Sequence, residues 1–185
     1  MEGTAEGASP RRPSDEASPE QLRLARVQGG AFQQAVDEMT RNVAHDGGEQ
    51  RSGDYVVGYA VEEAEGVYVD RDGELAWQEP TDENVHVEIV VRDASDGRFL
   101  PGLSVHATLV GPDGDEIGTE LQPFLWHPWL YHYGRNWHVP GDGAYTLKVR
   151  VDAPTFGRHD RRNGKRYVEP AEVEFARVEI KTGQK

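Results

Sequence analysis

The hydrophobic positions follow two different periods, and the change comes near residue 54. Before it, apolar residues recur every three or four positions, at Phe32, Val36, Met39 and Val43. That spacing is typical of an amphipathic helix, and we expect a helix over residues 21–44, with Gly29 and Gly30 weakening its first half.

From Asp54 onward, apolar residues alternate with polar ones, which is the period of β-strands. Val85, Val87, Ile89 and Val91 form one apolar face. Similar runs begin at Tyr55, Leu103 and Tyr145, with a last strand near 172–180, and turn sequences such as 70–73 and 111–114 separate them. About seven or eight short strands at this spacing predict an all-β fold, an immunoglobulin-like antiparallel β-sandwich over residues 54–182.

Two features refine this organisation. Residues 1–20 are rich in Pro, Ser and Gly and nearly free of large apolar residues, so we expect a disordered N-terminus. Residues 45–53 are polar and glycine-rich and are predicted to be a linker. Tyr145 follows an Asp-Gly-Ala turn, which resembles the tyrosine corner of Greek-key sandwiches, where the hydroxyl binds upstream backbone.

Charge and composition exclude several classes of function. The net charge is −13, of which −10 belongs to residues 54–185, and such an acidic surface argues against nucleic-acid binding. Sixteen arginines but only four lysines accompany 33 acidic residues, which indicates a halophilic, salt-adapted surface. Cysteine is absent, so disulfides and thiolate metal sites are excluded. No apolar run is long enough to cross a membrane, and no signal peptide is visible, which leaves a cytoplasmic location open.

A histidine and a carboxylate on one strand are the first candidates for chemistry. His86 and Glu88 alternate with the apolar face of their strand, so they share the opposite face about 7 Å apart. An imidazole and a carboxylate presented together can chelate a divalent metal. The local pattern alone equally fits two solvated polar residues.

The stretch from Phe124 to His138 is unusual in composition. It holds six of the 16 aromatic residues and three of the seven histidines, including His127 and His132. It does not alternate, so we expect a long loop or an irregular edge, a place where rigid sandwiches often carry function. His159 follows a Pro-containing turn in a basic segment, and taken alone is expected to be exposed.

Together these residues resemble the periplasmic iron-transport-associated proteins. The stretch Tyr131-His132-Tyr133-Gly134-Arg135-Asn136, followed by the glycine-rich turn and Tyr145, is similar to that family's His-Tyr-Gly-x-Asn signature. His86 and Glu88 resemble its early His and Glu, and His159 its later histidine. The resemblance covers roughly residues 54–180.

The resemblance implies a non-enzymatic copper- and iron-binding sandwich, often a homodimer, outside the cytoplasm beside an iron permease. It implies His86, His132 and His159 as metal ligands, with Glu88 alongside. The family's remaining ligand, a methionine shortly before the His-Tyr-Gly motif, is absent from its expected place, because the chain has only Met1 and Met39. His127 is the nearest substitute.

Without that thioether, a site of imidazoles and one carboxylate suits Cu(II), Fe(II) or Zn(II) better than Cu(I). Two alternatives stay open. The first is a metal-free interaction module that has lost its ligand set. The second is a carbohydrate-binding module that uses Trp126, Trp129 and Trp137. No nucleophile motif, phosphate-binding loop or paired-carboxylate motif indicates an enzyme.

Overall fold

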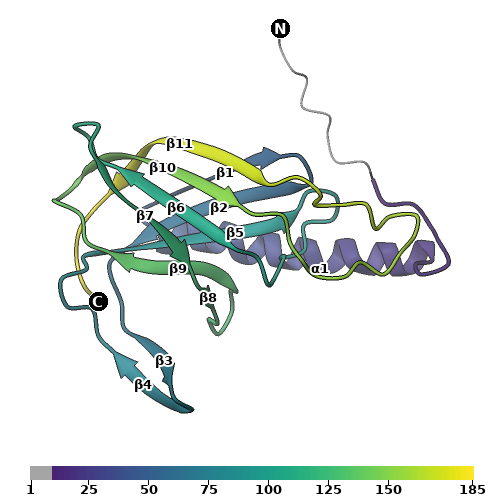
Figure 1. Cartoon of the computed structure of the whole chain (residues 1–185), viewed down its shortest axis with the longest axis horizontal. Coiled ribbons are helices and arrows are strands. Elements are labelled where there is room, and N and C mark those ends of the chain that lie inside the picture. The colour runs from purple at the N-terminus through teal and green to yellow at the C-terminus, as the bar shows by residue number, and fades with distance from the viewer. Residues whose placement is uncertain (1–9) are drawn as a thin grey trace, which may run out of the picture.

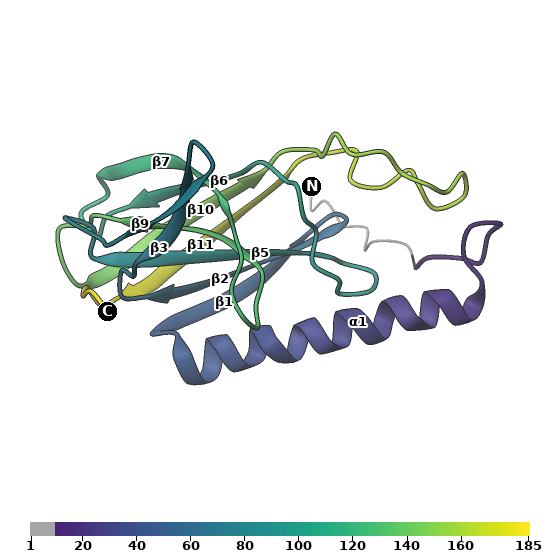
Figure 2. The same ribbon diagram turned by 90° about the horizontal axis from the view of Figure 1, so that it is seen from below.

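Two antiparallel sheets pack face to face, and one helix covers the outer face of the first sheet (Figures 1 and 2). The computed structural model describes residues 10–185. The first sheet has the order β1 (Asp46–Ser52), β2 (Tyr55–Glu62), β5 (Val85–Asp93), β9 (His132–Trp137) and β8 (Phe124–Leu125). The second has the order β11 (Ala171–Ile180), β10 (Gly143–Val151), β6 (Val105–Val110) and β7 (Glu116–Gln122). The predicted immunoglobulin-like sandwich with a short N-terminal helix is confirmed.

The alternating apolar positions form the core between the sheets. Val85, Val87, Ile89 and Val91 of β5 are fully buried there. The hydroxyl of Tyr145 donates to the carbonyl of Gly141 at 2.6 Å, as expected of a tyrosine corner.

A separate hairpin projects from the body of the sandwich (Figure 1). It consists of β3 (Val67–Arg71) and β4 (Glu74–Gln78). Its turn residues Asp72 and Gly73 both have positive φ, 56° and 89°, which is the conformation that a tight two-residue hairpin turn requires.

The N-terminal helix is longer at its start than the pattern predicted. α1 (Pro19–Glu38) is capped by Ser18, the residue before it. The Ser18 hydroxyl accepts a hydrogen bond from the backbone N–H of Gln21, and the Gln21 side chain accepts one from the backbone N–H of Ser18. This capping box satisfies backbone donors that a helix start leaves free. A short π-helix, η1 (Met39–Val43), continues the chain to the first strand.

The linker predicted for residues 45–53 is instead largely strand β1, which pairs with β2 along its whole length. Edge strands need no alternating apolar face, since backbone hydrogen bonds hold them, and this polar segment therefore gave no strand signal. The expected loop at 124–138 is also partly wrong, because β8 and β9 lie within it.

The disorder expected for residues 1–20 falls partly on residues 1–9, which lie outside the described residues. Among the described residues of this segment, Arg11 forms ion pairs with Asp93, the last residue of β5, and with Asp96 in the turn that follows it. The start of the described chain is therefore tied to the end of the sandwich that faces the first turn of α1.

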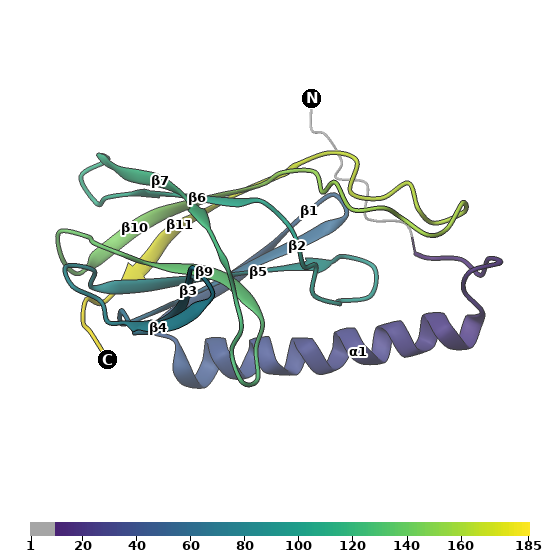
Figure 3. The same ribbon diagram turned by 60° about the horizontal axis from the view of Figure 1, so that its bottom comes forward.

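Covering both faces of the first sheet leaves β5 with no exposed residue; all nine positions are buried. Figure 3 shows α1 running below β1, β2 and β5, with the β8–β9 loop reaching down to it. A second, smaller core joins helix, sheet and loop, and contains Val36, Met39, Ala60, Val90 and Leu130.

Two adjacent glycines in α1 give a matched test of this docking. A Cβ on Gly29 would lie 1.7 Å from the carbonyl oxygen of Asp96, whereas a Cβ on Gly30 would meet nothing within 4 Å. We expect Gly29→Ala to lower the free energy of unfolding by about 2 kcal/mol or more through overpacking. Gly30→Ala should raise it by up to about 1 kcal/mol through helix propensity. Urea denaturation measures both, and a Gly29→Ala variant as stable as the wild type would contradict this docking.

Candidate metal centre

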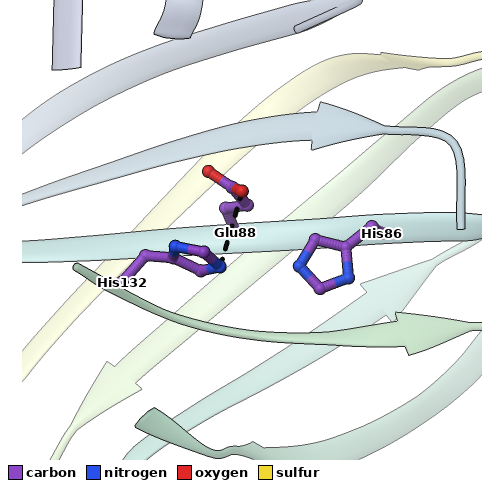
Figure 4. A group of neighbouring side chains, drawn as sticks. All are labelled: His86, Glu88 and His132. Carbon is purple, nitrogen blue, oxygen red and sulfur yellow. Dashed lines mark ion pairs between the residues drawn. The ribbon is translucent and has the colours of Figure 1, made fainter. Parts of the chain in front are cut away.

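Three polar side chains gather on the helix-facing side of the first sheet. His86 and Glu88 project from β5, and His132 reaches them from the start of β9 (Figure 4). Their positions follow from strand pairing, since Glu88 lies opposite Gly134 and Ile89 opposite Tyr133. Val85, Val87 and Val91 of β5 point into the sandwich core, so the alternation puts His86 and Glu88 on the other face.

The geometry of this group matches a chelating site. One ligand atom from each residue lies within 4.8 Å of the other two, and His132 Nε2 is 3.4 Å from Glu88 Oε1. All three residues are 1–2% exposed. His86 Nε2, Glu88 Oε2 and both His132 ring nitrogens have no hydrogen-bond partner. Buried polar atoms normally have partners, so these orphaned atoms fit a bound cation, and bonds of about 2.0–2.2 Å would join them after small side-chain shifts.

Asn136 holds His86 in one tautomer. The Asn136 amide faces the backbone of Glu65, donating to its carbonyl at 2.7 Å and accepting from its N–H at 3.3 Å. This pairing fixes which side of the amide is oxygen. His86 Nδ1, 2.8 Å from that oxygen, must therefore carry the proton, which leaves the Nε2 lone pair free for a metal.

Gly134 leaves the space in which the three side chains meet. A Cβ at this position would lie 2.9 Å from the Val87 carbonyl oxygen, 3.0 Å from His86 Nε2 and 3.1 Å from His132 Cδ2. Any side chain here would crowd the donor atoms. The glycine of the signature thus acts as a cradle beneath the site.

Burial keeps the three groups neutral near pH 7. Desolvation, together with the nearby Glu62 and Glu65, raises the pKa of Glu88 to about 8. Burial, with smaller effects of His86 and the nearby His127, lowers the pKa of His132 to about 3. Burial also lowers the pKa of His86. Neutral groups are far less costly to bury than charged ones, and neutral imidazoles are the form that binds metals.

Further acidic groups border the site on the β2 side. Glu62 lies opposite His86 across the sheet and is itself buried. Its carboxylate forms an ion pair with Lys185, whose ammonium also lies 3.9 Å from Glu65. The lysine offsets part of the negative charge around Glu88.

The structure places the other two predicted ligands differently. His127, in the β8–β9 loop, has its ring 6.3 Å from that of His132 and a buried, unpartnered Nδ1, so it lies beside the group without joining it. His159 is 97% exposed and 3.5 Å from Glu16. The structure does not bring it to the group, because the loop after β10 carries it past the end of the sandwich, toward the start of α1 (Figure 1).

Sequence reasoning did not single out Glu62 or Lys185, and gave Gly134 and Asn136 no role beyond the motif. Glu62 is the last residue of the otherwise apolar strand β2, which is a usable signal, because a carboxylate is almost never buried without a partner. Lys185 carries no comparable signal.

Comparisons with known proteins identify the family of this chain and solved structures that share its fold. Residues 47–181 match the family described as Fe2+ transport protein. FetP of a uropathogenic Escherichia coli strain superposes with a TM-score of 0.59 at 18% identity, covering 73% of this chain and 93% of FetP. Copper-reconstituted P19 of Campylobacter jejuni gives 0.60 and 18%, covering 75% of this chain and 96% of P19. No curated protein sequence matches significantly.

The raised pKa of Glu88 predicts a pH dependence for the metal-free protein. Native Glu88 stays protonated up to about pH 8, whereas in the unfolded chain it ionises near 4.5. The contribution of Glu88 to the free energy of unfolding is therefore complete below pH 4.5 and is lost as the pH rises through 8. Between pH 6.5 and 8 the loss is about 1.5 kcal/mol.

Urea denaturation in the presence of a chelator, at pH 6.5 and 8.0, measures this loss. The isosteric Glu88→Gln variant cannot ionise at this position, so the part of the stability loss that comes from Glu88 should be absent from it. Equal losses in the wild type and the variant would contradict the raised pKa.

Proposed function

Because the chain belongs to the Fe2+ transport protein family, we propose that it is a non-enzymatic protein that binds a divalent metal ion through His86, Glu88 and His132. The observation that carries the proposal is the set of buried, unpartnered donor atoms on these residues, gathered over Gly134. The alternative explanation, two solvated polar residues on one strand, does not account for their burial.

The chemistry of the donors limits the metal. Two imidazoles and one carboxylate suit Cu(II), Fe(II) and Zn(II), and copper is bound in the structurally similar P19. A divalent ion displaces the proton of Glu88 and places its positive charge between groups that are otherwise neutral. The acidic neighbours Glu62 and Glu65 favour the cation. His127 is the candidate for a fourth ligand, since a modest movement of its loop would turn its free Nδ1 toward the site.

The same family relation supports a role outside the cytoplasm, as a metal carrier beside an iron permease, with a homodimer as the working form. No helix among residues 10–185 is long and apolar enough to span a membrane.

Exposed aromatic rings near the site favour a second function for the β8–β9 region. Phe124, Trp126, Trp129 and Tyr131 are 41–70% exposed. Aromatic rings of this kind anchor protein contacts, so this surface is a candidate contact site whether or not metal is bound. This exposed aromatic surface is the observation that favours the alternative function, an interaction module that binds no metal.

Removing one imidazole tests the metal site directly. We expect His132→Ala to weaken binding of Cu(II), Zn(II) and anaerobic Fe(II) by more than about 100-fold, because ligand loss exceeds the effect of changing outer partners. Isothermal titration calorimetry at pH 7.5 measures the affinities. The matched control is His106→Ala, a half-exposed histidine on the second sheet. Unchanged affinity in His132→Ala, or no binding by the wild type, would refute the proposal.

Filling the cradle should block the site without removing any ligand. In Gly134→Ala, the new methyl group crowds His86 Nε2 and His132 Cδ2, and we expect a tenfold or greater loss of Cu(II) affinity. Gly157→Ala, whose Cβ meets nothing within 4 Å, serves as the control. Wild-type affinity in a folded Gly134→Ala protein would argue against a metal seated over this glycine.

A further inference from the structure

The N-terminal helix is an addition to the matched domain and covers the face that carries the donor atoms. The family match begins at residue 47, so α1 and η1 precede it. Both lie against the outer side of the first sheet (Figures 2 and 3), and η1 contacts β1 and β2 directly. What these elements present to the sheet therefore lies outside the matched domain.

The π-helix meets the sheet at the β1 end of the row of residues that contains Glu88. Strand pairing aligns Gly47 with Ala60, Ala60 with Glu88, and Glu88 with Gly134. At the β1 end of this row, the methyl group of Thr40 lies 2.8 Å from where a Cβ of Gly47 would stand. The residue before Thr40 is Met39.

Met39 packs next to the donor group. It is 2% exposed and belongs to the small core with Ala60, Val90 and Leu130. Ala60 is the strand partner of Glu88, and adjacent strands are about 4.8 Å apart. Val90 follows Glu88 by two positions on β5, so the two side chains lie on the same face of that strand. Two of the residues that surround Met39 are thus immediate neighbours of Glu88.

Met39 lies at the start of a local irregularity in the helix. Residues 39–43 form a single π-helical turn, a wider turn that is rare and often found at functional sites. The Ala44 N–H closes it on the carbonyl of Met39 at 2.9 Å, and Thr40 Oγ1 donates to the Val36 carbonyl at 3.0 Å. Met39 and Thr40 both approach the sheet from this turn.

We propose that Met39 provides a thioether ligand to the metal held by His86, Glu88 and His132, and so closes the site from the helix side. This inference rests on the proposed function. Met39 carries the only sulfur atom in residues 10–185. Its unbranched side chain has three rotatable bonds and a polarizable sulfur, so the sulfur can take up different positions within this small core. A soft ligand makes Cu(I) an acceptable guest of a site that otherwise prefers harder ions.

The test compares Cu(I) with Zn(II) in Met39→Leu, which keeps the volume and apolar packing but removes the sulfur. Anaerobic competition against a chromophoric Cu(I) chelator should show a tenfold or greater loss of Cu(I) affinity. Calorimetry should show Zn(II) affinity within about twofold of the wild type. Copper K-edge X-ray absorption should detect a sulfur neighbour in the Cu(I)-loaded wild type and none in the variant.

The control is Val36→Ala, which loosens the same helix–sheet contact but retains the sulfur, and should keep the Cu(I) affinity and the sulfur neighbour. Equal Cu(I) affinity in the wild type and Met39→Leu, or no sulfur neighbour in the wild type, would overturn the assignment. If His132→Ala abolishes binding while Met39→Leu changes nothing, only the role of Met39 fails. If His132→Ala also changes nothing, the proposed metal site fails with it.

Discussion

The structure depends on one constraint, which is that β5 is buried on both of its faces. Val85, Val87, Ile89 and Val91 pack into the sandwich, while His86 and Glu88 point under the helix and the β8–β9 loop. A polar face covered in this way must satisfy its donors and acceptors or pay a desolvation penalty of a few kcal/mol for each group left unpaired. Here His86 satisfies one ring nitrogen by donating its Nδ1–H to the amide oxygen of Asn136, and the remaining atoms converge.

Neutrality is what makes such a site tolerable before a metal arrives. A buried carboxylate and two buried imidazolium groups would each be costly, and burial shifts the pKa of each toward its uncharged form. The same desolvation strengthens the attraction for a divalent ion once Glu88 releases its proton. The apolar contacts of Val36 and Leu130 therefore act on the site electrostatically, since they exclude water from it.

Much of the fold followed from the sequence because the two-residue period of the strands is a local signal. It predicted the sandwich, the hairpin turn at Asp72 and Gly73, and the tyrosine corner of Tyr145. It failed at β1, an edge strand held by backbone pairing with β2. It also failed at β9, where His132, Gly134 and Asn136 share the buried helix-facing side, so the polar residues of this strand point inward and the alternation gave no strand signal.

The site itself was only partly predictable, for a reason of geometry. His86 and Glu88 could be paired because two residues along one strand necessarily share a face, and the motif that carries His132 joined them through the resemblance. Residues that approach from a different element have no such rule. Met39 lies 47 positions before His86, and only the docking of α1 and η1 places it against Ala60, beside Glu88. A thioether that is far from the motif along the chain thus packs against Ala60, beside Glu88, in the fold. The covering helix accordingly does more than bury the sheet, because under the proposed role of Met39 it adds a soft ligand to the centre and so widens the range of metals that the centre would hold.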